Sequence, residues 1–349
     1  MVIVGIDAHK RTHTAVAIDE AGRKLGEKTT RMTTTEANLE LLRWADGFGS
    51  ERRFAVEDCR HLSRRLEADL LAAGEELVRV PPKMMAHARD AARTYGKSDP
   101  IDALAVARAA WREPDLPLAR LDGPTRDLRL LVDHREDLVR DRVGQINRLR
   151  WHLHELDPAW DPTPRALVRF KHLEAVAARL ETLEGTVAWV ARDLVRRIRE
   201  LTVDVNDLER RITAIVSELA PALLALPGVG ALTAAKIVAE TADVRRFRSK
   251  DCFARHNGTA PLPVWSSNKV RHRLSRAGNR QLNAAIHRIA ITQMRIHDDA
   301  KVYLERRLAM GNTKTEALRA LKRKLSDVVF RALLVDAETA AEAPFSAAA

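Results

Sequence analysis

A long run of apolar residues constrains the fold of this chain most strongly. Between Leu173 and Leu219, leucine, isoleucine and valine recur in steps of three and four residues without a polar break. This spacing predicts one long coiled-coil helix. A shorter apolar pattern from Leu128 to Leu156 predicts a partner helix, and the proline-rich segment 157–164 separates the two. The simplest arrangement is an antiparallel hairpin without chemistry of its own; the alternative is that part of the run pairs with a second chain.

The amino-terminal third alternates strand and helix signals instead. Short β-branched runs predict strands, and segments with helical spacing separate them. The predicted order is hairpin, helix, strand, helix, strand, helix, which favours an α/β sheet whose first and later strands lie side by side. A ribonuclease H-like fold has this order. The hairpin signal comprises residues 2–6 and 12–18 and the turn 20–22, the strands are 54–56 and 78–80, and the helices are 35–44, 61–73 and one that opens at residue 99.

Four carboxylates stand at the ends of these elements. Asp7 follows the first strand, Glu57 follows a later one, and Asp99 and Asp102 open a helix. Clustered carboxylates that converge in such a fold typically hold a divalent cation, because the cation offsets their mutual repulsion. Simpler interpretations stay open. Asp99-Pro-Ile-Asp102 is also a good helix start, with Asp99 as N-cap, proline at the first helical position and Asp102 at N3. Gly-Ile-Asp7 also begins sugar kinases and actin-like ATPases, but no convincing phosphate loop follows.

The carboxy-terminal third contains two candidate nucleic-acid contacts. Leu-Pro-Gly228-Val-Gly230 precedes a helix of small residues and is similar to the hairpin of helix-hairpin-helix modules, where backbone amides bind phosphate; a plain tight turn is the alternative. A dense polar run follows, which is either a solvated loop with non-specific phosphate contacts or a cationic surround for an activated serine. Its residues with expected nucleic-acid contacts are Lys269, Arg271, Arg273, Arg276, Asn279 and Arg280.

Composition narrows the class of partner. The 349 residues suggest two or three modules, and the net charge of +11 favours an acidic polymer as partner. With only two cysteines, neither a disulfide framework nor a cysteine-based zinc site is supported, which fits a reducing cytoplasm. Neither a secretion signal nor a membrane span is expected. The small-residue segment from about Asp336 onward predicts a disordered tail.

Taken in order, the motifs resemble those of the DEDD transposases of the insertion-sequence family numbered one-ten, the bridge-RNA-guided recombinases. The resemblance covers most of the chain. It rests on Gly5-Ile-Asp-Ala-His-Lys10, Lys97-Ser-Asp-Pro-Ile-Asp-Ala103, the coiled coil, Leu226-Pro-Gly-Val-Gly230, Gly258-Thr-Ala-Pro261 and Ser275-Arg-Ala-Gly-Asn279. The resemblance implies a catalytic domain like that of the Holliday-junction resolvase RuvC (1–124), a coiled-coil hairpin for oligomerisation (125–219), and a mainly helical transposase domain (220–335).

The resemblance also implies the chemistry. Ser266, shortly after Gly258-Thr-Ala-Pro261, takes the place of the nucleophile that forms a covalent protein–DNA intermediate; Ser267, where the family has glycine, leaves this assignment ambiguous by one residue. Asp7, Glu57, Asp99 and Asp102 take the place of the Mg²⁺ (or Mn²⁺) ligands, with Asp58 as a rival to Glu57. The implied partners are donor and target DNA, a bridge RNA, and further copies of the chain in a dimer or tetramer. A hydrolytic junction resolvase that uses water as nucleophile and a non-catalytic nucleic-acid scaffold are the alternative functions.

Overall fold

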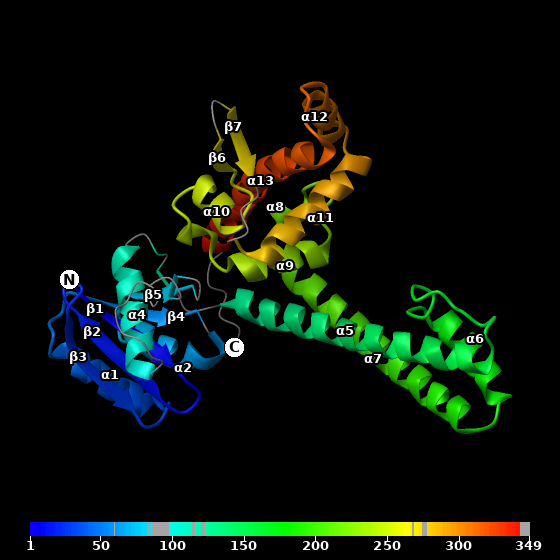
Figure 1. Ribbon diagram of the computed structural model, residues 1–349, viewed down its shortest axis with the longest axis horizontal. Coiled ribbons are helices and arrows are strands. Elements are labelled where there is room, and N and C mark those ends of the chain that lie inside the picture. Colours follow the sequence, from blue (N-terminus) through cyan, green and yellow to red (C-terminus); the bar gives the residue numbers. More distant parts are fainter. Residues whose placement is uncertain are drawn as a thin grey trace. The chain divides into compact units, whose positions relative to one another are not determined.

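The computed structural model describes residues 1–58, 60–81, 84–85, 98–113, 116, 118–119, 123–266, 269–273 and 278–342. Of residues 60–61, 264–266, 269–273 and 341–342 it describes the backbone alone. The chain divides into two compact units, Met1–Asp122 and Gly123–Ala349 (Figure 1).

A five-stranded sheet forms the centre of the amino-terminal unit, in the order β3-β2-β1-β4-β5. The central strand β1 pairs antiparallel with β2 and parallel with β4, and β4 pairs parallel with β5. The first and later strands therefore lie side by side, as the sequence predicted, and the hairpin extends to a third strand. The strands are β1 (Val2–Ala8), β2 (His13–Ile18), β3 (Lys24–Thr30), β4 (Arg52–Glu57) and β5 (Leu77–Val80).

Helices cover both faces of this sheet. On one face α1 (Thr35–Asp46) and α2 (Arg60–Ala72) bury Leu41 and Leu70 against the even-numbered residues of β1. On the other face α4 (Asp99–Arg112) packs along β1 and β2. This approach is very close. A Cβ on Gly5 would lie 2.3 Å from the amide nitrogen of Ala107 and 2.4 Å from the carbonyl oxygen of Ala103, so only glycine fits under the helix at this point.

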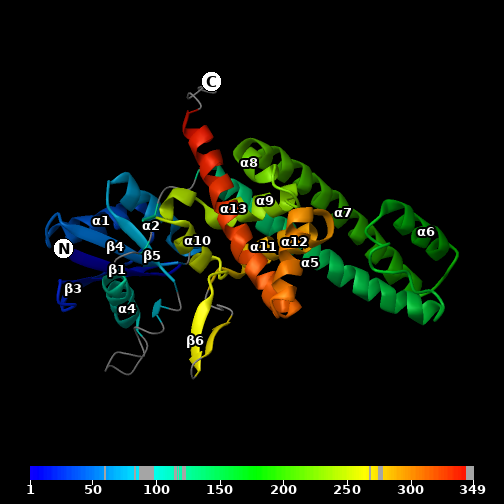
Figure 2. The ribbon, with the colours of Figure 1, turned by 90° about the horizontal axis from the view of Figure 1, so that it is seen from above.

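Two long helices, α5 (Pro124–Leu156) and α7 (Thr186–Leu219), dominate the second unit and pack side by side (Figures 1 and 2). They run antiparallel, because Arg135 contacts Glu209 whereas Arg142, further along α5, contacts Thr202. The predicted single helix from Leu173 to Leu219 is wrong. The chain leaves the helix between residues 182 and 185, where Gly185 has φ +96°.

The break separates off a short helix, α6 (Phe170–Glu181), which packs against α7. Its apolar residues share one core with the far ends of α5 and α7, for example through Leu180, Leu149 and Ile198. The three- and four-residue steps in the sequence thus marked burial correctly, although the helix is not continuous.

The near ends of α5 and α7 share a core with the remaining helices rather than forming a separate hairpin. These helices are α8 (Pro221–Leu224), α9 (Ala231–Thr241), the 3₁₀ turn η1 (Val244–Arg246), α10 (Lys250–His256), α11 (Arg280–Ile296), α12 (Asp298–Ala309) and α13 (Lys314–Glu342). A two-stranded antiparallel hairpin, β6 (Leu262–Ser266) and β7 (Lys269–Arg273), extends from the core between α10 and α11 (Figure 2).

Residues 336–342, which the sequence analysis predicted to belong to a disordered tail, are helical instead. The helix α13 continues to Glu342, and Asp336 itself is buried. Its carboxylate accepts hydrogen bonds from the amides of Ala222 and Leu223, at the start of α8. These bonds tie the last helix to the core and explain why the small residues that follow remain helical.

Candidate functional site

Strand pairing places two of the predicted carboxylates at one edge of the sheet. The parallel register pairs Ile6 of β1 with Val56 of β4, so that Asp7 and Glu57 are the next residues on the two strands. Odd-numbered positions on both strands, such as Ile3 and Ala55, face α4. Because side chains alternate along a strand, Glu57, the last residue of β4, belongs to the same α4-covered face as Asp7, whereas Asp58 lies beyond the strand.

Asp7, His9 and Asp99 form a compact group at this edge. The Nε2 atom of His9 lies 2.9 Å from Oδ2 of Asp7 and 3.4 Å from Oδ1 of Asp99. One potential ligand atom from each residue lies within 4.8 Å of the others, and within the described part of the chain this is the one group of its kind. Asp7 is almost fully buried, whereas the side chains of His9 and Asp99 are about half exposed. The group is therefore open to solvent on one side.

The electrostatics of Asp7 place Asp102 near the same group. Burial raises the pKa of Asp7, the charges of Asp102 and Asp99 raise it further, and the neighbouring imidazole of His9 opposes this shift. Asp102 is buried in the first turn of α4. A cation here would relieve both the burial and the repulsion, so the donor set fits a divalent metal ion.

The start of α4 differs from the simple cap that the sequence allowed. Ser98, not Asp99, is the N-cap residue, and its side chain makes no capping hydrogen bond. Asp99 is instead the first helical residue, Pro100 the second, and Asp102 the fourth, with its amide bonded to the carbonyl of Ser98. Both carboxylates lie near the positive end of the helix dipole, and Asp99 faces the group around Asp7.

Glu57 does not belong to the group of Asp7, His9 and Asp99, whose potential ligand atoms lie within 4.8 Å of one another. It ends β4 in a half-buried position, paired with Val80 of β5. The sequence interpretation missed His9, although it stands two residues after Asp7 in the motif Gly5-Ile-Asp-Ala-His-Lys10. Its signal was the period of two, which places residue 9 on the face of Asp7.

The segment that bears Ser266 belongs to the second unit. Ser266 ends β6 and pairs with Lys269 of β7, and its side chain lies outside what the structure describes. The same holds for the side chains of Lys269, Arg271 and Arg273 on β7. Ser267 and Arg276 lie wholly outside the described residues.

The base of this hairpin joins two motifs that are far apart in the sequence. A Cβ on Gly278 would lie 2.3 Å from the amide nitrogen of Gly258, so the two backbones touch. The amide of Asn279 donates to the carbonyl of His256 at 2.6 Å. The side chain of Asn279 accepts from the amide of Leu282, capping α11, and donates to Glu240. Asn279 therefore has a structural role besides the predicted nucleic-acid contact.

Buried polar side chains continue this base into the helical core. Lys322 of α13 donates to Oδ1 of Asn283 at 2.6 Å, and Asn283 donates to the carbonyl of Asn257. The carboxamide of Asn257 donates to Ser326 and accepts from Thr259. The segments that flank the hairpin are thus hydrogen-bonded to α11 and α13.

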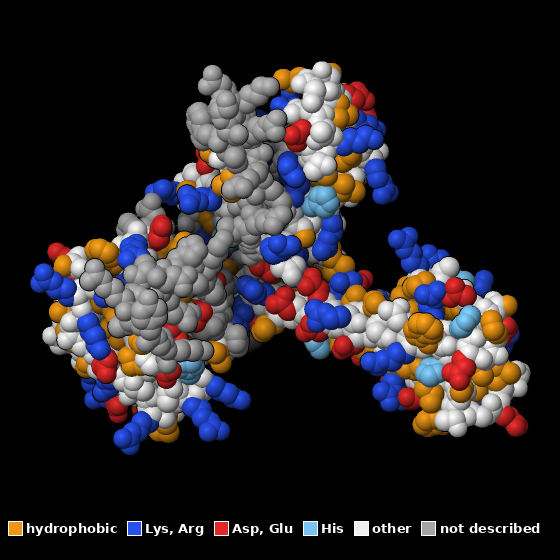
Figure 3. Space-filling view, in the orientation of Figure 1, with side chains coloured by type: hydrophobic (Ala, Val, Ile, Leu, Met, Phe, Trp, Pro, Cys, Tyr) orange, Lys and Arg blue, Asp and Glu red, His pale blue; other side chains and the backbone are white. Residues whose placement is uncertain are grey.

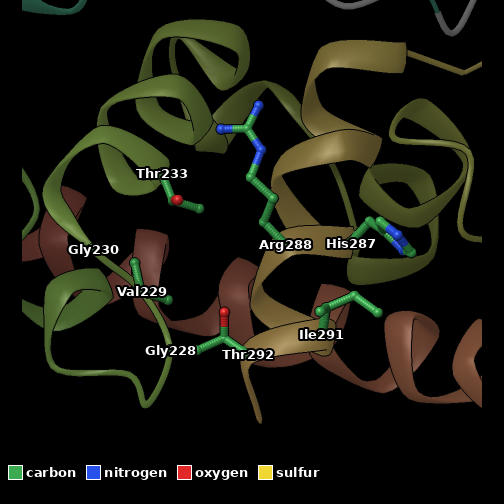
Figure 4. Close-up of a pocket in the computed structure, with 8 residues that line it drawn as sticks. All are labelled: Gly228, Val229, Gly230, Thr233, His287, Arg288, Ile291 and Thr292. Carbon is green, nitrogen blue, oxygen red and sulfur yellow. The ribbon is translucent and has the colours of Figure 1, made fainter. Parts of the chain in front are cut away.

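An open cavity of about 710 Å³ lies where the glycine-rich loop meets α11. Its lining includes Gly228 and Gly230, and Gly230 is the N-cap of α9. The first amides of a helix have no acceptor within the helix, so this end can bind an anion. Figure 4 shows that Arg288 leaves α11 on the side of Thr233, whereas His287 leaves it on the other side. A guanidinium is thus available beside the helix end.

The basic excess is not restricted to this cavity. Figure 3 shows lysine and arginine side chains on both units, intermixed with acidic ones. Arg280, the first residue of α11, is exposed. None of the described helices is long and apolar enough to cross a bilayer.

Comparison with known proteins identifies the family. Residues 4–158 match the DEDD transposases of IS110, and residues 220–305 match transposases of the IS116/IS110/IS902 family. A protein of insertion element IS116 from Streptomyces clavuligerus is 30% identical, over 98% of this chain and 96% of that protein. The chain belongs to the IS110 family of DEDD transposases. A protein of IS900 from Mycobacterium paratuberculosis is 28% identical to this transposase, over 95% of each chain.

The transposase is also similar to solved structures over a smaller part of its length. RuvC from Thermus thermophilus in complex with a Holliday junction substrate matches 34% of this chain and 99% of its own, at 16% identity and a TM-score of 0.28. As a family member, the transposase is a DNA-acting enzyme.

Proposed function

We propose that this transposase cuts and rejoins DNA strands through a covalent serine–DNA intermediate, with Asp7, Glu57, Asp99 and Asp102 as ligands of Mg²⁺ or Mn²⁺. One observation carries the proposal. Asp7 and Asp99, which are 92 positions apart in the sequence, lie close together at the edge of the sheet where Glu57 also ends its strand. Acidic side chains this close together, one of them almost fully buried, repel each other unless a cation offsets their charge, and this supports a metal-binding use.

The carboxylates supply the acidic half of the site. A bound divalent ion would polarise the scissile phosphate and favour the ionised serine. The residues of this chain set the position of that charge: β1 fixes Asp7, and α4, pressed against Gly5, fixes Asp99 and Asp102. Glu57 is preferred over Asp58, because alternation along β4 gives Glu57 the face of Asp7.

Ser266 supplies the nucleophile. Its hydroxyl oxygen attacks phosphorus, an Oγ–P bond forms, and the P–O bond to one deoxyribose breaks. The serine proton is transferred to the departing oxygen through solvent or a neighbouring base. The intermediate keeps the phosphoester bond, so the reverse reaction with another strand end rejoins DNA without a further energy source. Serine is a weak nucleophile at its ordinary pKa, and the basic residues of β7 together with a bound metal ion would compensate for this.

Nucleic acid is held by backbone contacts in this proposal. The cavity at Gly228 and Gly230 acts like the phosphate-binding turn of a helix-hairpin-helix module, with Arg288 beside it. The basic residues of β7 and Arg280 contact further phosphates. A bridge RNA pairs with donor and target DNA and so selects the DNA sequences that are joined. The reaction takes place in the cytoplasm.

The two halves of the site lie in different compact units. We infer that the serine of one copy serves the carboxylates of another, which makes a dimer or tetramer obligatory for activity. The helical pair α5 and α7 provides a coiled-coil surface for this assembly. The exposed Trp151 and Trp189 on these two helices are available for contact with a second copy.

The experiment incubates the transposase with DNA that carries the junction of its element, RNA from the flanking region and Mg²⁺, and detects protein–DNA adducts on a denaturing gel. We expect an adduct that disappears in both Ser266→Ala and Asp102→Asn. Loss in Ser267→Ala alone moves the nucleophile by one residue. Cleaved ends that survive both serine changes would establish hydrolysis by water and overturn the serine mechanism. Salt-sensitive binding without cleavage by any variant would overturn the catalytic proposal as a whole.

A further inference from the structure

We propose that His9 is a direct ligand of the metal ion and that its nitrogen makes the site prefer Mn²⁺ to Mg²⁺. This inference rests on the proposed function of the carboxylates and identifies the cation that they hold. It starts from the position of His9, whose Nε2 atom is turned toward both Asp7 and Asp99.

The distances fit neighbouring ligands of one ion. In an octahedral site with bonds of about 2.1 Å, adjacent ligand atoms lie about 3.0 Å apart and opposite ones about 4.2 Å apart. Nε2 of His9 lies 2.9 Å from the Asp7 oxygen and 3.4 Å from the Asp99 oxygen, and the three atoms lie within 4.8 Å of one another. An ion can therefore bind all three with small rotations of the side chains.

The backbone holds His9 in this position. Its amide donates to the carbonyl of Thr12 at 2.9 Å, in the tight turn that joins β1 to β2. Asp7 is fixed by the centre of the sheet, and its side chain is only 6% exposed. The imidazole is 46% exposed, so an incoming ion and its remaining water ligands have access from the solvent. Two of the three ligands thus come from one rigid strand and its turn.

The donor type decides the preferred metal. Mg²⁺ takes oxygen ligands almost exclusively, whereas imidazole binds transition-metal ions well. Mn²⁺ takes carboxylate oxygens in octahedral geometry, as Mg²⁺ does, but as a transition-metal ion it also binds imidazole. A set of carboxylates with one imidazole therefore suits Mn²⁺ better than Mg²⁺. The competing structural role is a simple hydrogen bond from the imidazole to Asp7, which would steady the carboxylate without touching the metal.

Electron paramagnetic resonance of Mn²⁺ bound to the full-length transposase distinguishes the two roles. We expect pulsed spectra to show hyperfine coupling to one ¹⁴N nucleus, and His9→Asn to abolish that coupling and weaken Mn²⁺ binding by about tenfold or more. His9→Asp restores an oxygen donor and should shift the preference back toward Mg²⁺ in competition titrations. His172→Asn, an exposed histidine on α6, is the matched control and should behave as wild type.

Bound Mn²⁺ without ¹⁴N coupling, or the same Mn²⁺ to Mg²⁺ preference in wild type and His9→Asp, would overturn the proposal. Asp7→Asn separates this failure from failure of the carboxylate site. If Asp7→Asn removes Mn²⁺ binding while nitrogen coupling is absent in the wild type, the carboxylates hold metal and only the role of His9 is wrong. If Asp7→Asn leaves Mn²⁺ binding intact, the carboxylate site itself is refuted.

Discussion

The contact between Gly5 and α4 gives the sharpest quantitative prediction. In Gly5→Ala the new methyl carbon would lie 2.3 Å from the backbone nitrogen of Ala107 and 2.4 Å from the backbone oxygen of Ala103. Relaxed contacts between such atoms are about 3.5 Å, so α4 must move away from β1 by about 1 Å. The clashing atoms belong to the helix backbone, and no change of side-chain rotamer relieves the overlap.

Two effects oppose each other in this substitution. Alanine restricts the unfolded chain, which favours folding by about 0.4–1 kcal/mol. Overpacking of a tight core costs about 1–3 kcal/mol, and here it acts on backbone atoms, so the upper end applies. The net loss is about 2 kcal/mol, which lowers the melting temperature of a unit of this size by roughly 10 °C. The displaced helix carries Asp99 and Asp102, so divalent-metal binding should weaken as well.

Scanning calorimetry of the full chain, with and without Mn²⁺, measures both effects. Gly144→Ala is the matched control. Gly144 lies inside α5 with open space around its Cβ position, so the substitution should raise the stability of its own unit by about 1 kcal/mol. A Gly5→Ala protein that melts and binds Mn²⁺ as the wild type does would refute the close packing of α4 on β1, and with it the geometry of the carboxylates.

Three further predictions concern other parts of the chain. Burial lowers the pKa of His13 from its usual 6.5 to about 4. The neutral imidazole therefore stabilises the fold above pH 6.5, and about 3 kcal/mol of this stability should be lost as the pH falls from 6.5 to 4. In acid denaturation curves, His13→Phe should abolish this loss. Asp336→Ala leaves two amides of α8 without acceptors and should lower the free energy of unfolding in urea by about 1–3 kcal/mol. Arg288→Gln should reduce the slope of log K against log salt for DNA binding by about one, and an unchanged slope would exclude a phosphate contact there.

Local patterns predicted most of the amino-terminal unit, because its strands and helices follow periods of two and 3.6 that burial on one face imposes. What local patterns cannot contain is the partner of each face. Gly5 looked like an ordinary residue of a strand, and its requirement comes from α4, about one hundred residues later. His9 stood in the same motif, but it becomes a candidate ligand only because its Nε2 atom lies 3.4 Å from Oδ1 of Asp99. The helix start at Asp99 was predictable, but its N-cap was misplaced by one residue.

The interrupted helix shows a second limit of periodicity. Leu173 and Leu180 on α6 keep the spacing of the run on α7, because both helices bury their apolar faces in one core. The spacing therefore reports which residues are buried and is silent about whether the backbone continues. The local signal for the break was Gly185, whose positive φ no helix accommodates.

The hairpin that bears Ser266 shows how distant motifs depend on each other. Gly258 and Gly278 press their backbones together at its base, and Asn279 joins that base to α9 through Glu240. Contacts at both ends of the hairpin therefore hold the segment that bears the serine. Residues of these motifs need not touch DNA to matter for the reaction. A substitution such as Asn279→Ala should therefore impair formation of the covalent adduct while leaving metal binding at Asp7 unchanged. If Asn279 acted only through a phosphate contact, lowering the salt concentration would restore adduct formation in this variant.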